Sequence, residues 1–464
     1  MASPTGNVVP FKTQKETAEE AQARAKGNPS EFSFAEAFEC QYEGEWMHDH
    51  LRGKWLKFNE VGIWQEDETE ESRHLMREHV DRLSQGVPKW RAAKVVSGVE
   101  RLVRARPGIA TLRTALDADP FLLGTPRGVY DLEAGELLPH DPAHLVTKCT
   151  AVAPEKGPAP RWEQFLREAT GNAKDFMDFL QRLAGYCLTG DTREESLHFF
   201  WGPGGNGKGV FLGALSDVMG PYARTASMAT FLQSKQPQHT SDLADLYGAR
   251  LVIGSESSEG ARWDEQRMKA VSGRDFLTVR HLYGQFFTYK PTFKVALAAN
   301  HKPRIPAVDE GWRRRMHLIP FDKKPANPDH ELKDKLREEY PQILQWMIEG
   351  CELWLAEGLA PPGVVLDASK AYLEEEDTLG LWIKERCIKG GTAKPAELFA
   401  DYATWCEGMG HGAGTQHKLT RYLKNHGYEQ SLTLAGRPFT GLRLPTSEEL
   451  DARRKGTPRD WGWE

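Results

Sequence analysis

A glycine-rich stretch between an apolar run and a helix-forming run constrains the fold of this chain more than any other feature. WGPGGNGKGVF spans residues 201–211; the strand-like LHFFW leads into it, and the helix-competent KGVFLGALSDVM follows. Glycines let backbone N–H groups face phosphate oxygens, and the N-terminus of the following helix adds partial positive charge. Strand, glycine loop and helix in this order therefore predict an α/β domain with a phosphate-bearing ligand at the loop.

The same loop fits two phosphate-binding patterns. Gly202, Gly204 and Gly207 match the G-x-G-x-x-G of dinucleotide folds. Gly202, Gly207 and Lys208 match the G-x-x-x-x-G-K of nucleoside triphosphatases, with Gly209 in place of the usual Ser or Thr. A dinucleotide fold needs an acidic residue about 20 positions further on to hold a ribose, and MGPYARTASMATF offers none.

We therefore expect ATP and Mg²⁺ at this loop, with a dinucleotide or a turn without ligand as the weaker alternatives. The residues expected to hold ATP are Gly202, Gly204, Gly205, Asn206, Gly207, Lys208 and Gly209.

Length, charge and cysteine content limit the remaining possibilities. The 464 residues correspond to about three domains. No run approaches the roughly 18 apolar residues of a membrane span, so no membrane association is expected. The net charge of −6 means that any nucleic-acid site must come from local clustering of basic residues. Six scattered cysteines without a C-x-x-C pair favour a reducing cytoplasm over a disulfide framework or a zinc site.

Composition shifts divide the chain into segments. GKWLKFNEVGIWQ and RGVYDLEAGELLPHDP are typical of hairpins, and ESRHLMREHVDRLSQ of a helix. The Pro/Gly-rich APEKGPAP predicts a linker at 153–160. The expected divisions are a flexible polar leader at 1–30, a mixed α+β N-terminal region at 31–152, a helical lead-in at 161–195, an ATPase domain at 196–360 and a C-terminal domain at 361–464.

Four short apolar runs, LHFFW, ARLVIGSE, FLTV and TFKVALAAN, predict a central sheet. Two of them end in residues that ATP hydrolysis requires. Glu256, with Glu259 just beyond it, is a candidate for the acid that holds a metal or activates water, and Asn300 could hold the attacking water. The structural alternatives are solvated acids and a turn asparagine.

Three consecutive arginines, Arg313, Arg314 and Arg315, precede the apolar MHLIPF. They are either surface charge or the source of an arginine finger that reaches the ATP of a neighbouring subunit, which would imply a ring.

The order of GPGGNGKG, RLVIGSE, VSGRDFLTVRHLYG, FKVALAANHKP and WRRRMHLIPF resembles superfamily 3 helicases, specifically the phage/plasmid and poxvirus-type primase-helicase family. The similarity covers roughly residues 30–450 and includes GVYDLEAGELLPH and FLQRLAGYCLTGDT ahead of the loop. It implies AAA+-like P-loop ATPase domains in a hexameric ring that moves 3′ to 5′ along single-stranded DNA.

The resemblance also implies roles for individual residues. Lys208 would be the phosphate-loop lysine, Glu256 the Walker B acid at the metal, and Asn300 sensor 1. Either Arg314 or Arg315 would be the arginine finger. Lys269 and Gly273 would belong to the motif peculiar to these helicases, with Lys269 taken as a nucleic-acid contact.

The chain departs from the family pattern in three places. Gly209 lacks the hydroxyl that touches Mg²⁺, so coordination would depend on water, phosphates and acids such as Glu256. No spaced pair of metal-binding acids marks a primase site; His48 to His50 is the nearest cluster, and primase activity is not expected. The DNA-contacting hairpin, RHLYGQFFTYK, lacks the usual lysine near its tip, and its candidate contacts are Arg280, His281, Tyr283 and Lys290.

The C-terminal segment has the pattern of a winged helix. AELFADYATWCEGMG and QHKLTRYLKNH predict two helices, and YEQSLTL with PFTGLRL predicts a hairpin. A basic cluster on it could contact phosphates, although a protein-docking role is the alternative. Its members are Lys418, Arg421, Lys424, Arg437 and Arg443.

Together with these patterns, the resemblance implies an ATP-dependent DNA helicase, an ATP hydrolase acting in the replication of a phage, plasmid or similar element. Expected partners are single-stranded or forked DNA, further copies of the chain, and a separate primase or other replication proteins. The main alternative is an ATP-dependent initiator that binds or melts an origin without processive unwinding. A small-molecule kinase and a scaffold are weaker alternatives.

Overall fold

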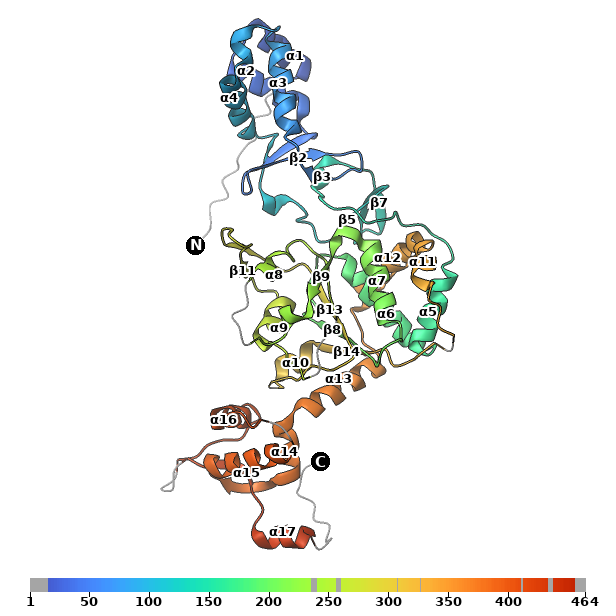
Figure 1. Ribbon diagram of the computed structural model, residues 1–464, viewed down its shortest axis with the longest axis vertical. Coiled ribbons are helices and arrows are strands. Elements are labelled where there is room, and N and C mark those ends of the chain that lie inside the picture. Colours follow the sequence, from blue (N-terminus) through green and yellow to red (C-terminus); the bar gives the residue numbers. More distant parts are fainter. Residues whose placement is uncertain are drawn as a thin grey trace, which may run out of the picture.

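The computed structural model describes residues 16–234, 240–255, 260–306, 308–325, 327–409, 412–432 and 437–454, without the side chains of 451–454. Four N-terminal helices lie at one end of the long axis, a sheet with its helices lies in the middle, and a smaller α/β unit lies at the other end (Figure 1). No helix within these ranges is both long and apolar enough to cross a bilayer.

The N-terminal unit combines four helices with a small sheet. The helices are α1 (Ala18–Gly27), α2 (Glu31–Tyr42), α3 (Glu71–Leu83) and α4 (Ala93–Arg104). The strands β1 (Trp46–Asp49), β2 (Lys54–Phe58), β3 (Trp64–Glu66) and β4 (Ala110–Thr111) follow the order β3-β2-β1-β4. Strands β2 and β3 form the hairpin predicted from GKWLKFNEVGIWQ, and α3 is the predicted helix.

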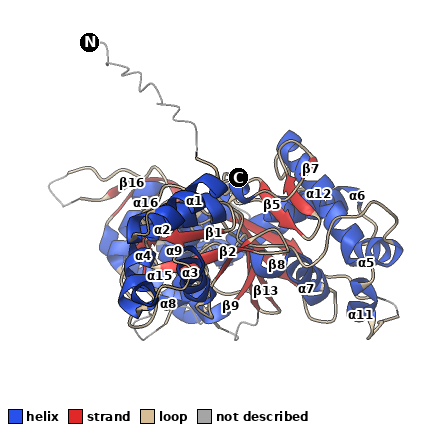
Figure 2. Cartoon of the chain, turned by 90° about the horizontal axis from the view of Figure 1, so that it is seen from above, coloured by secondary structure: helices blue, strands red, loops and turns tan. Residues whose placement is uncertain are grey.

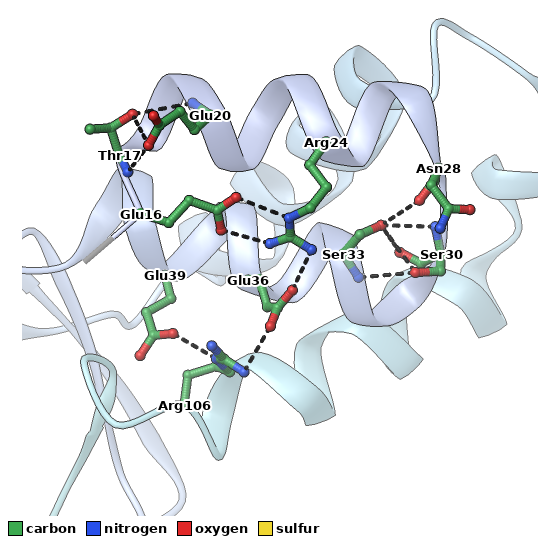
Figure 3. Close-up of polar contacts among 10 residues, drawn as sticks. All are labelled: Glu16, Thr17, Glu20, Arg24, Asn28, Ser30, Ser33, Glu36, Glu39 and Arg106. Atoms are coloured by element: carbon green, nitrogen blue, oxygen red, sulfur yellow. Dashed lines mark hydrogen bonds and ion pairs between the residues drawn. The ribbon is translucent and has the colours of Figure 1, made fainter. Parts of the chain in front are cut away.

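The prediction of a flexible leader over residues 1–30 is wrong for α1. A capping box joins Thr17 and Glu20: the Glu20 N–H donates to Thr17 Oγ1 at 3.3 Å, and the Thr17 N–H donates to Glu20 Oε2 at 2.9 Å. Ala21 and Ala25 are fully buried in the core with α2, and Arg24 pairs with Glu16 just before its helix and with Glu36 of α2 (Figure 3). The segment is mostly polar, so its composition predicts no folded helix, yet the burial of two alanines is enough to pack a short helix against α2. Residues 1–15 lie outside the described ranges.

A three-stranded sheet follows, formed by β5 (Leu122–Thr125), β6 (Gly128–Asp131) and β7 (Glu136–Leu138). Strands β6 and β7 are the second predicted hairpin. Leu123 and Tyr130 belong to the same apolar cluster as the helices of the central unit. This part of the predicted N-terminal region therefore packs as part of the central unit.

The central sheet is fully parallel. Its strands are β8 (Leu197–Trp201), β9 (Ala223–Ser227), β10 (Leu251–Ser255), β13 (Lys294–Ala299) and β14 (Met316–Pro320), in the order β14-β8-β13-β10-β9. Three of the four predicted strands lie in it. The fourth run, FLTV, instead forms β11 (Leu277–Val279), which pairs antiparallel with β12 (Phe287–Tyr289) outside the sheet. In β11 the exposed Thr278 lies between two buried residues, the pattern of a strand with one face exposed to solvent.

Helices cover both faces of this sheet. Helices α5 (Pro160–Thr170), α6 (Lys174–Leu188), α7 (Lys208–Met219), α11 (Leu332–Arg337) and α12 (Tyr340–Glu357) share one apolar cluster, and in Figure 2 α5, α6 and α12 gather at one side of the strands. Gly185 and Gly350 let α6 and α12 touch, because a Cβ at Gly185 would lie 2.0 Å from the Cys351 nitrogen. The other face carries α8 (Ser241–Ala244), α9 (Glu265–Ser272), α10 (Glu310–Arg315) and α13 (Gly363–Glu376).

The predicted boundary between residues 360 and 361 separates α13 from the sheet that it covers. Helix α13 packs on β14 and buries Tyr372 and Leu373 in the core of the central unit. The central unit thus extends to Glu376. The C-terminal unit comprises α14 (Thr378–Arg386), β15 (Ile388–Ala393), α15 (Pro395–Gly408), α16 (Gln416–Asn425), β16 (Phe439–Arg443) and α17 (Ser447–Arg454).

The predicted C-terminal hairpin is present in a different form. Strand β16 pairs antiparallel with β15, and residues 428–432 meet β16 through the single bridge Gln430–Phe439. Because β15 pairs with one edge of β16, the segment YEQSLTL, which was predicted to pair with β16, can meet only its other edge. Residues 433–436 of the predicted hairpin lie outside the described ranges.

Candidate nucleotide site

The glycines of the loop after β8 meet specific backbone demands. Gly204, Gly205 and Gly207 have φ values of 99°, 67° and 86°, a left-handed region that residues with a Cβ rarely adopt. At Gly202 a Cβ would lie 2.0 Å from the carbonyl oxygen of Phe321, at the end of the neighbouring strand. The glycine pattern read from the sequence therefore has a steric cause at four positions.

Lys208 is the focus of the loop. Its Nζ donates to the Gly202 carbonyl at 2.7 Å, to Asn206 Oδ1 at 3.1 Å and to Asn300 Oδ1 at 3.1 Å. The side chain is buried, and desolvation lowers the pKa of Lys208. Asn300 follows β13, which lies beside β8, so two residues 92 positions apart meet where parallel strands end. The structure thus brings together two residues predicted independently for ATP chemistry.

The surroundings of Lys208 provide few ligands for a cation. Gly209 is exposed in the first turn of α7 and has no hydroxyl; a Cβ there would meet open space. The described residues contain no group of three His, Cys, Asp or Glu side chains that could hold a metal ion. Glu256 and Glu259 lie outside the described ranges; β10 ends just before them, with Ser255 beside Ala298 of β13. The predicted role of Glu256 at the metal therefore stays a prediction.

The three arginines lie at the opposite edge of the sheet from the loop. They form the last turn of α10, directly before β14, whose first residue Met316 pairs with Leu197 at the start of β8. The loop follows the other end of β8, and a five-residue strand spans roughly 13 Å. These arginines therefore cannot serve the loop of their own chain without a large displacement.

Each arginine has a carboxylate partner. Arg314 and Arg315 both bind Glu195 Oε2, at 3.3 and 3.0 Å, and Arg313 binds Asp377 Oδ2 at 3.3 Å. Side-chain exposure separates the first two, because Arg314 is 66% exposed and Arg315 only 15%.

Comparisons with known proteins agree with this architecture. The family model described as "D5 N terminal like" matches residues 35–171, and the "Family of unknown function (DUF5906)" matches residues 200–315. A protein of Acanthamoeba polyphaga mimivirus named "Putative helicase" is 28% identical over 238 residues, which is 50% of this chain and 25% of that protein. The chain thus matches about a quarter of the length of this relative.

The apo structure of the NrS-1 C terminal region shares the fold. It covers 90% of this chain and 100% of its own, with a TM-score of 0.51 and 12% identity. Together the matches are consistent with a phage-type primase-helicase family. The D5-type match runs from within α2 to just past the end of α5, and the second family match spans the glycine loop, the β11–β12 hairpin and the three arginines.

The residues predicted for the DNA-contacting hairpin lie in or beside the loop between β11 and β12. Tyr283 is 99% exposed, and the Arg280 guanidinium lies 4.8 Å from the centre of the Phe286 ring. His281 stacks on Phe287 and lies 3.3 Å from Asp245. Lys290 is exposed directly after β12. An exposed aromatic and basic loop of this kind can stack on bases and contact phosphates.

Lys269, Lys418 and Arg421 are brought together, although 149 residues separate the first two. They line a cleft of about 360 Å³ between α9 and α16. The Lys269 ammonium is held by Asp309 at 2.6 Å and Glu265 at 2.8 Å, and the Lys418 ammonium donates to the Pro306 carbonyl. The predicted contact of these three residues with nucleic acid stays a prediction, and the ammonium groups of Lys269 and Lys418 already have partners within the protein.

The remaining basic residues of the C-terminal cluster differ in their surroundings. Arg421, Lys424 and Arg437 are exposed, whereas Arg443 forms a two-pronged ion pair with Glu449 at 2.7 and 2.8 Å.

Three carboxylates of this region were not singled out from the sequence. Glu195 binds two arginines; Asp309 caps α10 and binds Lys269; Asp377 caps α14 and accepts from Arg313 and the Tyr422 hydroxyl. Asp309 could have been found as the helix cap before EGWRRR. Asp377 carries the same local signal as the cap of α14, whereas Glu195 carries none because both of its arginine partners are distant in sequence.

Proposed function

We propose that this chain is an ATP-driven DNA helicase that acts in replication as a ring of identical subunits, with movement from 3′ to 5′ on single-stranded DNA. The meeting of Lys208 and Asn300 carries the proposal. An ammonium and an amide at the carboxyl edge of a parallel sheet, behind a glycine loop, suit the binding and hydrolysis of a nucleoside triphosphate. The helicase-named relative supports the same activity.

The residues at the loop are proposed to have separate roles in binding and hydrolysing ATP. The three acceptors of Lys208 are neutral oxygens, so its ammonium can exchange them for the stronger charge of the β- and γ-phosphates. Asn300 would then be released to orient the attacking water. ATP would enter as its Mg²⁺ complex, with Glu256 as the nearest proposed protein carboxylate.

The position of the arginines supports an assembly of several subunits. Since Arg314 lies at the edge of the sheet away from its own loop and is largely exposed, it could reach a loop on a neighbouring copy. We assign Arg314 rather than Arg315 as the arginine finger, because Arg315 is mostly buried against Glu195. A hexamer is the assembly expected for such a ring.

Two elements are proposed to contact DNA. The exposed loop of the β11–β12 hairpin would follow the strand through the ring and move as ATP is hydrolysed. The C-terminal unit, with its order helix, strand, helix, helix, strand, is proposed to be a winged helix whose exposed Arg421 and Lys424 meet phosphates.

The test measures ATP hydrolysis with and without single-stranded DNA, and separation of a duplex carrying a 3′ tail. We expect DNA to stimulate hydrolysis and the duplex to be unwound, and Lys208→Ala to abolish both. Hydrolysis that ignores DNA, together with no unwinding, would contradict the proposal. Melting confined to an origin sequence would favour the initiator alternative.

A further inference from the structure

The segment from Arg82 to Arg106 concentrates positive charge in a chain whose net charge is negative. It contains seven Lys and Arg residues and a single acid, Glu100, and so carries a net charge of +6, whereas the whole chain carries −6. The segment comprises the end of α3, the short helix η1 (Pro88–Arg91) and α4. The N-terminal unit therefore has a local excess of positive charge, which is the first requirement of a surface that binds a polyanion.

Three of these seven basic residues are paired with carboxylates of the protein, and Figure 3 shows one of them, Arg106, between Glu36 and Glu39 of α2. The other two pairs are Arg91–Asp81 and Arg104–Glu100. Three further basic residues are exposed and form no ion pair or side-chain hydrogen bond with any residue that the structure describes: Lys89, Lys94 and Arg101. The charge of these three is therefore open to a ligand.

Helix α4 presents two of these cations on one side. Lys94 and Arg101 are seven residues apart, with the exposed Ser97 between them, so they lie on the same face of the helix. Seven residues of an α-helix span about 10 Å. The opposite face is buried in the core of the N-terminal unit through three valines: Val96, Val99 and Val103. Packing of the valines therefore turns both cations toward solvent.

The third cation is held at the start of the same helix. Lys89 lies in η1, which contacts both α3 and α4. Its Nζ lies 4.7 Å from the centre of the Trp90 ring, and that ring packs edge-on against Phe34 of α2, with centroids 5.3 Å apart. We call the surface formed by Lys89, Lys94 and Arg101 the basic face. Its position is fixed by the core of the N-terminal unit.

The composition of the basic face favours a nucleic-acid backbone over an acidic protein as its partner. Among the large apolar side chains of residues 84–106, Val87 alone is exposed, at 42%. Protein partners depend on apolar or aromatic anchors that become buried. Phosphate groups instead take Lys, Arg and small hydroxyl side chains such as Ser97, and need no apolar anchor. The side chains present therefore match phosphates better than a protein surface.

The N-terminal unit also lies next to the proposed DNA hairpin. The Arg113 guanidinium, which follows β4, lies 5.5 Å from the centre of the Tyr247 ring, and Tyr247 meets Phe287 of β12 edge-on at 5.9 Å. In Figure 1 β11 accordingly lies on the side of the central unit that faces the N-terminal unit. A strand held by the hairpin loop would thus reach the N-terminal unit next.

We propose that the basic face of the N-terminal unit binds the sugar–phosphate backbone of DNA, single-stranded or duplex, beyond the β11–β12 hairpin. The inference rests on the proposed function, because the same DNA is proposed to contact the hairpin. It gives the N-terminal unit a part in holding DNA that is separate from the hairpin and from the C-terminal unit.

The first test removes two charges of the basic face. Lys94→Gln combined with Arg101→Gln is compared with Arg127→Gln combined with Lys156→Gln, which removes the same charge from two exposed residues elsewhere. Binding of a single-stranded and of a duplex oligonucleotide is measured by fluorescence anisotropy over a series of salt concentrations.

We expect the Lys94 and Arg101 pair to weaken at least one oligonucleotide about 10-fold at the lowest salt concentration. The slope of log affinity against log salt should become shallower by about 1.4 for a single strand or about 1.8 for a duplex, as the loss of two phosphate contacts requires. The control pair should change affinity less than about threefold. The oligonucleotide with the larger effect identifies the form of DNA that the basic face holds.

Chemical protection of the unmodified protein gives an answer even if the double variant misfolds. Acetylation of Lys89 and Lys94 by a water-soluble reagent is followed by mass spectrometry with and without each oligonucleotide. We expect DNA to slow acetylation of both lysines about fivefold or more and to leave Lys156 unchanged. Polyglutamate of equal charge should protect them much less. Equal protection by polyglutamate would indicate an acidic protein partner and overturn the assignment to DNA.

Failure of this inference can be distinguished from failure of the proposed function. If wild type unwinds a tailed duplex, but the folded double variant binds both oligonucleotides as wild type does and DNA leaves Lys89 and Lys94 unprotected, only the assignment of the basic face is overturned. If DNA neither stimulates ATP hydrolysis nor is unwound, yet protects both lysines and binds the double variant more weakly, the helicase proposal is contradicted and the basic face is supported.

Discussion

The two edges of the central sheet each hold a buried lysine that donates to backbone carbonyls. At the carboxyl edge, Lys208 binds the Gly202 carbonyl and two asparagine side chains. At the amino edge, Lys294 binds the carbonyls of Thr189 and Asp191, the latter at 3.2 Å. Their exposures, 7% and 3%, are almost the same.

What differs is the space and the kind of partner around each ammonium. Lys208 lies behind a loop that borders a cavity of about 460 Å³. The Lys294 ammonium lies over the Tyr186 ring, whose centre is 4.7 Å from its Nζ, and burial lowers the pKa of Lys294 to about 7. Burial and hydrogen bonding are therefore common to both lysines, and adjacent space for a ligand is what distinguishes Lys208, the lysine that we propose binds phosphates.

The largest expected effect concerns activity at the carboxyl edge. Lys208→Ala should lower the rate of ATP hydrolysis by about 100-fold or more, because it removes the cation nearest the proposed phosphates. The midpoint of chemical unfolding should change little, since Lys208 is at the start of α7, behind a loop that borders a cavity, where water can replace its ammonium. A large loss of stability, with the activity of each folded molecule retained, would instead indicate that Lys208 has a structural role.

The matching change at the amino edge should have the opposite profile. Lys294→Met should leave ATP hydrolysis within twofold of wild type. It should lower the free energy of unfolding by about 1–3 kcal/mol at pH 8.5, because the carbonyls of Thr189 and Asp191 lose their donor. Urea denaturation measures the difference, with Lys370→Met, at an exposed position of α13, as control. Loss of activity in a stable Lys294→Met protein would show that this edge is functional too.

The pH dependence of stability sharpens the comparison further. Between about pH 7 and the ordinary lysine value of 10.5, the unfolded chain holds a proton that folded Lys294 lacks. The free energy of unfolding should therefore rise with pH, by roughly 1–2 kcal/mol between pH 7 and 8.5. Unfolded thiols begin to lose protons at the upper end of this window, while burial raises the pKa of Cys187 and Cys351 to about 12. This opposing effect is the same in wild type and Lys294→Met, so the difference between the two slopes reports Lys294. Lys294→Met should flatten the slope, and an unchanged slope would contradict the assignment.

The smallest effect is expected next to Lys208 itself. Gly209→Ser should leave ATP hydrolysis unchanged or raise it about twofold, and it should lower the Mg²⁺ concentration needed for half-maximal rate. Gly209 has no positive φ, and a side chain there meets open space. The measurement is the steady-state rate over a Mg²⁺ titration. A severe loss would mean that the loop cannot accept any side chain at this position.

Features that depend on neighbouring residues were predictable from the sequence. The two hairpins at 54–66 and 128–138 follow from turn residues between alternating runs, and the glycine loop follows from its spacing. The approach of Asn300 to Lys208 was also implied, because both follow strands whose ends meet in a parallel sheet.

Features that depend on distant partners were not predictable. Helix α1 forms because α2 covers its two alanines, and α13 joins the central unit because β14 receives Tyr372. The ion pairs of Arg313 and Arg315 need Asp377 and Glu195, which no local pattern connects to them. The buried position of Lys294 is likewise invisible in TFKVALAAN, where it resembles the polar start of a strand.

The attachment of the small sheet β5-β6-β7 to the central unit has a consequence for dividing the chain into pieces. The Tyr222 hydroxyl accepts from the Gly124 N–H at 2.9 Å and donates to the Lys148 carbonyl at 3.1 Å, and Arg250 donates to the Leu122 carbonyl at 2.6 Å. Each of these hydrogen bonds joins a residue that precedes the segment 153–160 in the sequence to a residue that follows it, although this segment has the composition of a linker. A chain cleaved there would remain a single two-piece particle, so this site suits a split protein that reassembles better than it suits a domain boundary.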